Sequence, residues 1–158
     1  MIRTGIGQSS RRFLPADSSK PCVIAGLIFD DIPGFQSSSD GDVVFQALAN
    51  AITSLTHVEI IGGLAEDLFT KDGITDSEVY LKQGLESLHK QKVTYISITL
   101  EAKRPNFKQH FSKMRHHIAR LFGIDSSQVG ITAISGDGLT DFGCGDGVQC
   151  FALITTVE

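Results

Sequence analysis

The segment Ser39-Asp40-Gly41-Asp42 holds the residues whose types and spacing best suit chemistry. It precedes an apolar run that predicts a helix, so Ser39 can cap that helix and Asp42 stands at its third position, where a carboxylate favours free N–H groups. A phosphate oxygen could use the same N–H groups, although the bare motif is more often an ordinary helix cap. Because two acidic residues repel a phosphate, a site here needs metal ions or a nearby basic side chain.

Composition narrows the function classes. The 158 residues carry 14 basic and 18 acidic side chains and a net charge of −4, which gives no general attraction for nucleic acid or an anionic membrane. Cys22, Cys144 and Cys150 lack the spacing of a disulfide framework or a zinc ligand set. With no signal segment and no apolar run near the ~20 residues of a membrane span, we expect one cytoplasmic domain, residues 1–158.

Hydrophobic periodicity predicts alternating strands and helices. The middle of residues 59–73 and the glycine-rich segment 136–147 are expected to be irregular, and the second is either a tight hairpin connection or a binding loop. Thr75-Asp76-Ser77-Glu78 fits a capping box. The expected strands are residues 2–7, 22–29, 93–102, 129–135 and 148–157, and the expected helices are residues 42–55, 75–90 and 111–122.

These elements predict an α/β (α+β) fold with a single sheet of about four to five main strands and helices on one face. Each predicted helix has one apolar face, so the helices can be placed together on one side of the sheet. The other side carries Thr, Ser and small apolar residues and needs a partner. Packing against identical subunits is the favoured arrangement, so we expect a symmetric oligomer.

Several short motifs, in order and at compatible spacing, together resemble the 2-C-methyl-D-erythritol 2,4-cyclodiphosphate synthase family. The resemblance covers nearly the whole chain. It implies homotrimers of α/β subunits with active sites between neighbouring subunits. The motifs are Gly5-x-Gly7 followed by Phe13, Ser39-Asp40-Gly41-Asp42, Gly62, Ala102-x-x-Pro105 and Gly143-x-Gly145-Asp146-Gly147.

The resemblance also implies a reaction. In that family, the 2-phosphate of a cytidine diphosphate derivative of methylerythritol attacks the β-phosphate of the same molecule, which yields the cyclodiphosphate and CMP. The step belongs to the non-mevalonate isoprenoid pathway. Family members use zinc and a magnesium or manganese ion.

The zinc positions implied by the resemblance hold other residue types. The family binds zinc through an Asp-x-His pair near the N-terminus and a His on the helix after Ser-Asp-Gly-Asp, and these positions are Ser9, Arg11 and Gln46 here. Catalytic zinc takes imidazole, thiolate or carboxylate ligands, whereas a guanidinium stays protonated and cannot coordinate. The sequence therefore predicts that zinc does not bind there, and no cofactor is expected.

Some of the other site positions implied by the resemblance are retained and others are replaced. Ala102 to Pro105 matches the segment that frames the cytosine, and Asp137 stands where the family supplies Glu to the second metal. Ser38, Asn50, Ile60 and Cys144 replace the His, Asp, Asp and Arg that many members carry. By resemblance, the substrate-binding positions are Ser38, Ser39, Gly62, Ala102, Pro105, Ser135 and Asp137, and Arg11 is a candidate phosphate contact.

The basic residues of the last predicted helix and the three cysteines are interpreted as structural rather than catalytic. Arg115-His116-His117 with Lys113 predicts a solvated helix face, because sequential helical residues point about 100° apart. Cys22 and Cys150 fit the interior of strands. Cys144 lies in a loop where it could be exposed, yet no adjacent base makes it a nucleophile.

Three functions stay open. In a working synthase, Arg11 must replace a divalent Lewis acid, and a loss of even ~4 kcal/mol costs roughly a thousandfold in rate, so we expect little turnover. The fold could instead serve as a trimeric scaffold, in an engineered variant with a second protein component or in a natural pseudoenzyme. The third function is metal-independent binding of cytidine nucleotides or isoprenoid diphosphates. We favour a homotrimer that has lost catalytic activity. Its candidate partners are other copies of this chain and a cytidine nucleotide.

Overall fold

Strands and helices alternate along residues 1–158, all of which this computed structural model describes. The strands are β1 (Ile2–Arg12), β2 (Cys22–Ile24), β3 (Leu27–Phe29), β4 (Lys92–Glu101), β5 (Val129–Ile134) and β6 (Gly147–Val157). The α-helices are α1 (Val43–Thr56), α2 (Ala65–Asp72), α3 (Ser77–Leu85), α4 (Phe111–Phe122) and α5 (Asp141–Cys144). Short helical turns are η1 (Ile60–Leu64), η2 (Glu86–Leu88), η3 (Lys108–His110) and η4 (Ser126–Gln128).

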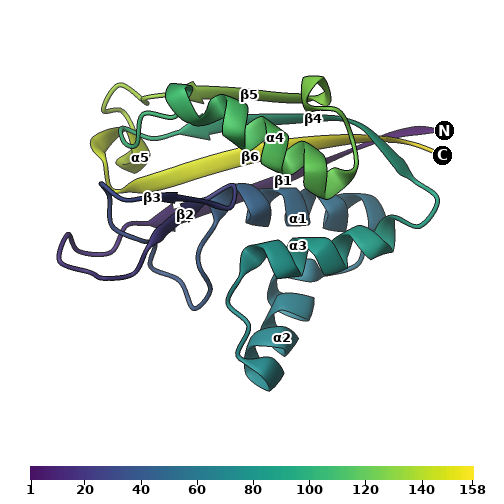
Figure 1. The fold of residues 1–158 in the computed structure, drawn as a ribbon, viewed down its shortest axis with the longest axis horizontal. Helices are drawn as coiled ribbons and strands as arrows, with labels where there is room; N and C mark the ends of the chain where they lie inside the picture. Colours follow the sequence, from purple (N-terminus) through teal and green to yellow (C-terminus); the bar gives the residue numbers. More distant parts are fainter.

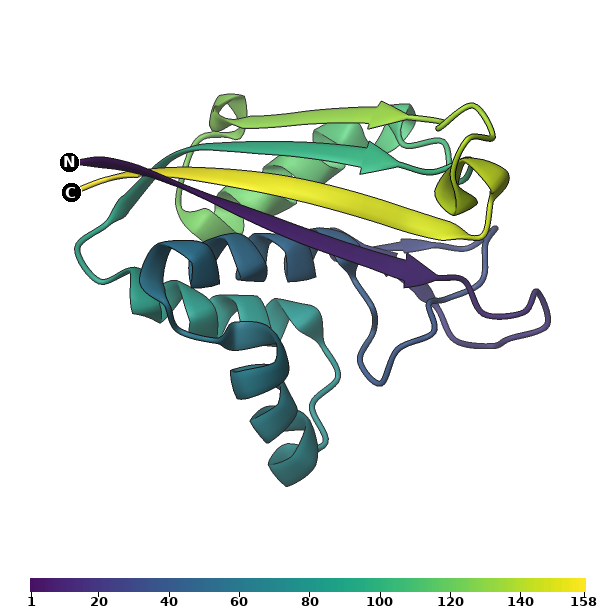
Figure 2. The ribbon, with the colours of Figure 1, turned by 180° about the vertical axis from the view of Figure 1, so that it is seen from behind.

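One four-stranded sheet, in the order β1-β6-β4-β5, forms a layer of the structure. Its neighbours are antiparallel except for the parallel pair β4 and β5. Helices α1, α3 and α4 lie on one face of the sheet, and β2 and β3 form a separate hairpin at one end (Figures 1 and 2). The predicted α/β fold with helices on one face is confirmed.

Helix α1 packs directly on β1 because two glycines leave room for its backbone. A Cβ atom at Gly7 would overlap the carbonyl oxygen of Ala47, and one at Gly5 would overlap that of Ala51. Both glycines face the helix, whereas Ile6 between them faces away, since successive strand residues alternate between the two faces. The 34 buried apolar residues form one cluster between the sheet and the helices.

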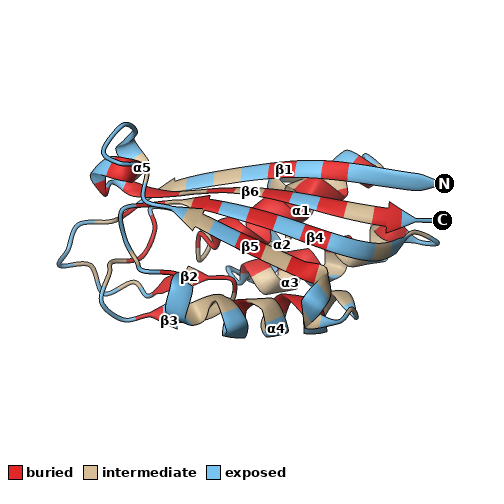
Figure 3. Ribbon diagram, turned by 90° about the horizontal axis from the view of Figure 1, so that it is seen from above, coloured by how far each residue is buried: buried red, intermediate tan, exposed pale blue.

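The face of the sheet opposite the helices carries exposed apolar side chains. Ile6, Tyr95 and Leu153 are 57%, 46% and 40% exposed, and they come from three neighbouring strands. Figure 3 shows buried and exposed residues alternating along these strands. This face is uncovered in the single chain, as expected when the helices lie on one side of the sheet.

Several predicted boundaries are wrong. The single strand expected over residues 22–29 is two short strands, because Ala25 and Gly26 adopt positive φ angles of 53° and 73° and turn the chain back. Strand β1 continues to Arg12 rather than ending at residue 7, since it pairs with β6 along its whole length.

Two segments expected to be irregular contain helix. Residues 59–73 include η1 and α2, although Ile61 and Gly62 have non-helical backbone angles, so the break expected in the middle is present. The loop 136–147 includes the four-residue helix α5. Helix α3 ends at Leu85 and continues only as the turn η2, short of the expected residue 90, and its N-cap is Asp76 rather than Thr75.

No single helix has both the length and the hydropathy needed to cross a membrane. The segments Val43–Thr56 and Ile60–Asp72 meet those criteria only as a pair, and the pair is bent by 99°.

Candidate functional site

Helix α1 is capped by Asp42, and the prediction that Ser39 caps it is wrong. Asp42 Oδ1 accepts hydrogen bonds from the N–H groups of Val44 and Phe45, both at 3.1 Å. The same carboxylate accepts from Ala25 at 2.9 Å and Gly26 at 2.7 Å, at the turn between β2 and β3. Asp42 therefore occupies N–H groups that a phosphate could have used at this helix terminus.

Burial controls the charge state of Asp42. The side chain is completely buried, and this burial, followed by the negative charge of Asp40, raises the pKa of Asp42 to about 7. Hydrogen bonds from Gly26, Phe45 and Ala25 oppose the rise. Asp42 is thus a structural carboxyl group that joins the β2–β3 turn to α1.

Asp40 and Lys20 complete a second set of contacts around the serine-rich turn before α1. Asp40 Oδ2 accepts from the N–H group of Ser77 at 2.9 Å, and Asp40 Oδ1 accepts from the Ser77 hydroxyl. Lys20 Nζ donates to the carbonyl oxygens of Phe35, Ser37 and Ser39 at 2.8, 2.8 and 2.7 Å. We refer to Lys20, Asp40, Asp42 and Ser77 as the loop cluster.

The positions implied as zinc ligands meet one another between β1 and α1. Gln46 Oε1 accepts from Arg11 Nη2 at 2.9 Å and from Ser9 Oγ at 3.3 Å. Gln46 Nε2 donates to Ser39 Oγ at 2.9 Å, and the Gln46 residue is only 3% exposed. We refer to Ser9, Arg11 and Gln46 as the strand cluster, because Ser9 and Arg11 lie on the helix-facing side of β1.

The strand cluster does not fit a zinc ion. Its side chains offer a hydroxyl, a guanidinium and a carboxamide in place of metal ligands. The carboxamide oxygen of Gln46 already accepts two hydrogen bonds. Zinc sites use His, Cys and carboxylate ligands, and no group of three such side chains is arranged to hold a metal ion anywhere in the structure. Arg11 also leaves its buried Nε without a hydrogen-bond acceptor, and its positive charge has no carboxylate partner within ion-pair distance.

A cavity of about 420 Å³ opens beside the strand cluster. Arg11, Gln46 and the serine turn form its polar end, and Ile61 and Phe69 contribute apolar surface. The predicted residues Arg11, Ser38, Ser39 and Gly62 are brought together here. Ile60, which stands at the expected ribose position, is completely buried and does not line the cavity.

A second cavity of about 420 Å³ gathers another part of the predicted site. It is lined by Ala102, Pro105 and Ser135, together with Lys103 and neighbouring residues. Asp137 lies beside it, because Ser135 Oγ donates to Asp137 Oδ1 at 3.1 Å. The two cavities share no lining residue, so a single chain divides the predicted site into two groups.

The sequence profile of the YgbB family matches residues 2–157. This chain belongs to the YgbB family. Among curated relatives, 2-C-methyl-D-erythritol 2,4-cyclodiphosphate synthase from Chlamydia felis is 53% identical over 159 residues, which cover 100% of this chain and 90% of the relative. The protein of the same name from Chlamydia caviae is 54% identical over the same shares.

Solved structures show the same fold as this YgbB-family chain. The bifunctional IspDF from Campylobacter jejuni gives a TM-score of 0.87 at 25% identity, over 99% of this chain and 42% of that one. A 2C-methyl-D-erythritol 2,4-cyclodiphosphate synthase from Plasmodium vivax gives a TM-score of 0.83 at 22% identity, over 100% and 99% of the two chains. The second likeness concerns the fold alone.

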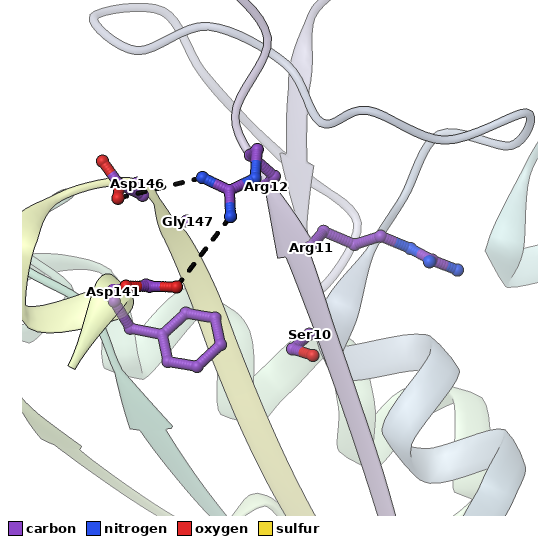
Figure 4. Close-up of a pocket in the computed structure, with 7 residues that line it drawn as sticks. Ser10, Arg11, Arg12, Asp141, Asp146 and Gly147 are labelled. Atoms are coloured by element: carbon purple, nitrogen blue, oxygen red, sulfur yellow. Dashed lines mark ion pairs between the residues drawn. The ribbon is translucent and has the colours of Figure 1, made fainter.

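Figure 4 shows a third, smaller cavity of about 150 Å³ at the end of β1 in this YgbB-family chain, and both Arg11 and Arg12 are among its lining residues. Arg12 lies near Asp141 and Asp146, with nitrogen–oxygen distances of 3.9 and 3.8 Å. Arg11 and Arg12 point away from one another, as expected for consecutive strand residues. The two arginines therefore have different surroundings, and only Arg12 has carboxylate partners.

Sequence reasoning missed Lys20 and misplaced His117 in this family member. Lys20 donates hydrogen bonds to three backbone carbonyls, and no sequence pattern predicts such contacts. His117 is not on a solvated face, because its Nε2 lies 3.0 Å from Glu78 Oε2 and its ring stacks on Phe45. A helical pattern does not reveal that α3 and α1 approach this side of α4.

The predicted burial of Cys22 and Cys150 in strands is confirmed, whereas Cys144, expected in a loop, is the last residue of α5. Cys22 and Cys150 are buried, and burial raises the pKa of the Cys22 thiol to about 12. Cys144 is exposed, and its Sγ lies 3.4 Å from the carbonyl oxygen of Gly138.

Proposed function

We propose that this chain keeps the fold of a 2-C-methyl-D-erythritol 2,4-cyclodiphosphate synthase but does not bind zinc, and that it turns over CDP-methylerythritol 2-phosphate slowly or not at all. The supporting observation is that Gln46 Oε1 accepts hydrogen bonds from both Arg11 and Ser9. The three side chains satisfy one another at the place where the resemblance implies zinc ligands.

The energetic argument concerns charge. A divalent ion at a phosphoryl group stabilises developing negative charge by several kcal/mol. Arg11 supplies one delocalised positive charge that can hold an oxygen but cannot act as a Lewis acid. Since ~4 kcal/mol corresponds to roughly a thousandfold in rate, we expect turnover far below that of the named relatives.

A homotrimer is the assembly we propose for residues 1–158, which we assign to one domain. The exposed side chains of Ile6, Tyr95 and Leu153 lie on the face of the sheet that no helix covers. Burial of such apolar surface between copies stabilises association. The division of the predicted site into two cavities on one chain also supports a site completed by a neighbouring subunit.

The retained positions support a nucleotide-facing pocket. We propose that Ala102, Pro105 and Ser135 receive a cytidine base and that Asp137 positions Ser135. A solved structure whose title reads "IspF (Plasmodium falciparum) CDP complex" matches the fold over 99% of this chain, at 21% identity and a TM-score of 0.83. Binding of a cytidine nucleotide here is independent of the strand cluster, so the scaffold can retain it.

Release of CMP from CDP-methylerythritol 2-phosphate, measured with zinc and magnesium supplied, tests this proposal. We expect CMP release at least roughly a thousandfold slower than for the Chlamydia felis relative under the same conditions. Sedimentation of the same sample reports the oligomeric state. Zinc-dependent CMP release at the relative's rate would overturn the proposal and favour a working synthase.

A further inference from the structure

Basic residues are concentrated in one segment of the chain. Residues 102–124, which lead from the end of β4 through η3 and α4, contain six lysine and arginine side chains and no acidic one. The rest of the chain carries all eighteen acidic side chains and only eight basic ones. The segment is therefore a local positive surface on a chain whose net charge is negative, and it attracts anionic groups at that surface alone.

Lys113, His116 and Arg120 form one exposed face of α4, because residues three and four positions apart lie on the same side of a helix. We refer to these three residues as the basic helix face. His116 Nδ1 lies 2.7 Å from the carbonyl oxygen of Ser112, so Nδ1–H donates to that oxygen and Nε2 stays available to a partner. Arg120 Nη2 lies 3.1 Å from His117 Nδ1.

No acidic group of the chain neutralises this surface. None of the five ion pairs in the structure includes a lysine or arginine of residues 102–124. Asp125, the first acidic residue after the segment, accepts a hydrogen bond from the N–H group of Ser127 at 2.8 Å and so caps its own turn. The positive charges of the basic helix face are therefore free to pair with groups from another molecule.

The cations also oppose the dipole of α4. Lys113 is the third residue of this helix, the first turn contains no acidic residue, and His110 at the N-cap forms no side-chain hydrogen bond to the helix. Helices α2 and α3, in contrast, both have acidic residues in their first turns. A cation near a helix N-terminus is unfavourable by about 0.3–1 kcal/mol, and an anionic partner would offset this cost.

The side chains around the basic helix face narrow the class of partner. Phe107 is buried and Phe111 and Phe122 pack against the core, so no phenylalanine ring is exposed for stacking on nucleic acid bases. None of the exposed large apolar side chains of the chain belongs to residues 102–124, so α4 offers no apolar surface for insertion into a membrane. The face extends only about 10 Å along the helix axis, at ~1.5 Å per residue, which suits a short acidic segment of a protein.

We propose that the basic helix face docks a short acidic segment of another protein through Lys113, His116 and Arg120. This inference goes beyond the proposed function, because none of the three residues lines either cavity of the candidate site. Helix α4 belongs to the helix layer, whereas the proposed trimer uses the opposite face of the sheet (Figures 1 and 3). The basic helix face is therefore accessible in the proposed trimer.

Fluorescence anisotropy with a labelled octaglutamate peptide tests this inference, with octaglutamine as the neutral peptide. We expect octaglutamate to bind the unaltered chain and to bind Lys113→Gln, Arg120→Gln roughly 10-fold more weakly, because two charge pairs are lost. The matched control Lys71→Gln, Lys92→Gln removes two exposed lysines that form no ion pair elsewhere and should bind as the unaltered chain does. Raising the salt concentration from about 50 to about 500 mM should weaken binding, and octaglutamine should not bind.

Amide NMR shifts of the unaltered chain on addition of octaglutamate, confined to η3 and α4, support the inference even if the α4 variant does not fold. Absence of octaglutamate binding, or equal weakening in the two variants, rejects the basic helix face as a docking surface. Tighter binding of an octathymidylate or of phosphatidylglycerol vesicles than of octaglutamate at the same residues overturns the protein assignment. Salt-dependent association of trimers that is lost in Lys113→Gln, Arg120→Gln would instead assign the face to a second copy of this chain.

Discussion

The loop cluster and the strand cluster lie side by side at the start of α1, yet they differ in how fully their polar groups are paired. In the loop cluster, Asp42 and Lys20 bind backbone groups that fix the course of the chain. In the strand cluster, Arg11 has one protein acceptor and a buried Nε without a partner. The first cluster therefore fixes the backbone around the cavity, and the second places incompletely paired polar groups at the wall of the cavity.

The largest expected change in activity comes from restoring the metal ligands that the resemblance implies, with the loop cluster left unchanged. The triple variant Ser9→Asp, Arg11→His, Gln46→His should bind zinc and raise the rate of CMP release by up to roughly a thousandfold, because ~4 kcal/mol of charge stabilisation returns. Zinc titration and the CMP assay measure the two effects. Gln46→His alone is the matched control and should gain neither, since one imidazole does not make a site.

Substitution of Asp42 should destabilise the folded chain. Asp42→Ala leaves four N–H groups without their acceptor, so we expect the free energy of unfolding to fall by about 2–4 kcal/mol in urea denaturation. The matched control is Asp76→Ala at the N-cap of α3, which removes one such bond and should cost about 1 kcal/mol. Equal losses for the two variants would contradict the special role of the loop cluster.

The raised pKa of Asp42 predicts a pH dependence of stability. Its pKa lies near 7 in the folded chain and at the ordinary 3.8 when unfolded, so the folded state binds the extra proton between these values. The free energy of unfolding should therefore decrease as the pH rises from 4 to 7, by at most about 1.4 kcal/mol per unit from this group.

Asp42→Asn isolates that contribution, because asparagine does not titrate. Relative to Asp42→Asn, the unaltered chain should lose stability as the pH rises through this window and show no further change above it. A difference between the two proteins that stays constant from pH 4 to 7 would show that Asp42 is ionised throughout, with its four hydrogen bonds outweighing the effect of burial.

The smallest effect is expected from Lys20. Lys20→Met removes three hydrogen bonds but keeps most of the apolar stem, so we expect a loss of about 1 kcal/mol in the free energy of unfolding. Urea denaturation measures this loss, and a loss as large as that of Asp42→Ala would contradict the smaller contribution assigned to Lys20.

The fold was largely predictable because the main strands and helices have clear patterns in their own local sequence. Strand β6 and helix α4 have clear periodicities, and Gly123 ends α4 in the left-handed conformation expected of a C-cap. The start of α1 was not predictable in the same way. Ser39 and Asp42 are both good capping residues, and the choice between them depends on the turn at Ala25 and Gly26, which is distant in sequence.

The candidate site was predictable only in part. The proximity of Ser9 and Arg11 to Gln46 was expected only from the family resemblance, because the first strand was predicted to end at residue 7. In the structure, strand alternation along the longer β1 places Ser9 and Arg11 on the same side. The contacts of Lys20 could not be foreseen, because backbone carbonyls carry no sequence signal. Helix α2 was obscured by the glycines on both sides of it, which indicate turns. Ile61 and Gly62 break the helical backbone before α2, and Gly73 ends α2 in the left-handed conformation.

Elemental analysis of the purified chain, after saturation with zinc and exhaustive dialysis, tests the central claim most directly. The hydrogen-bonded arrangement of Ser9, Arg11 and Gln46 predicts zinc far below one equivalent per chain, with the triple variant retaining the ion under the same treatment. Stoichiometric zinc in the unaltered chain, located by anomalous scattering between these three side chains, would contradict the account.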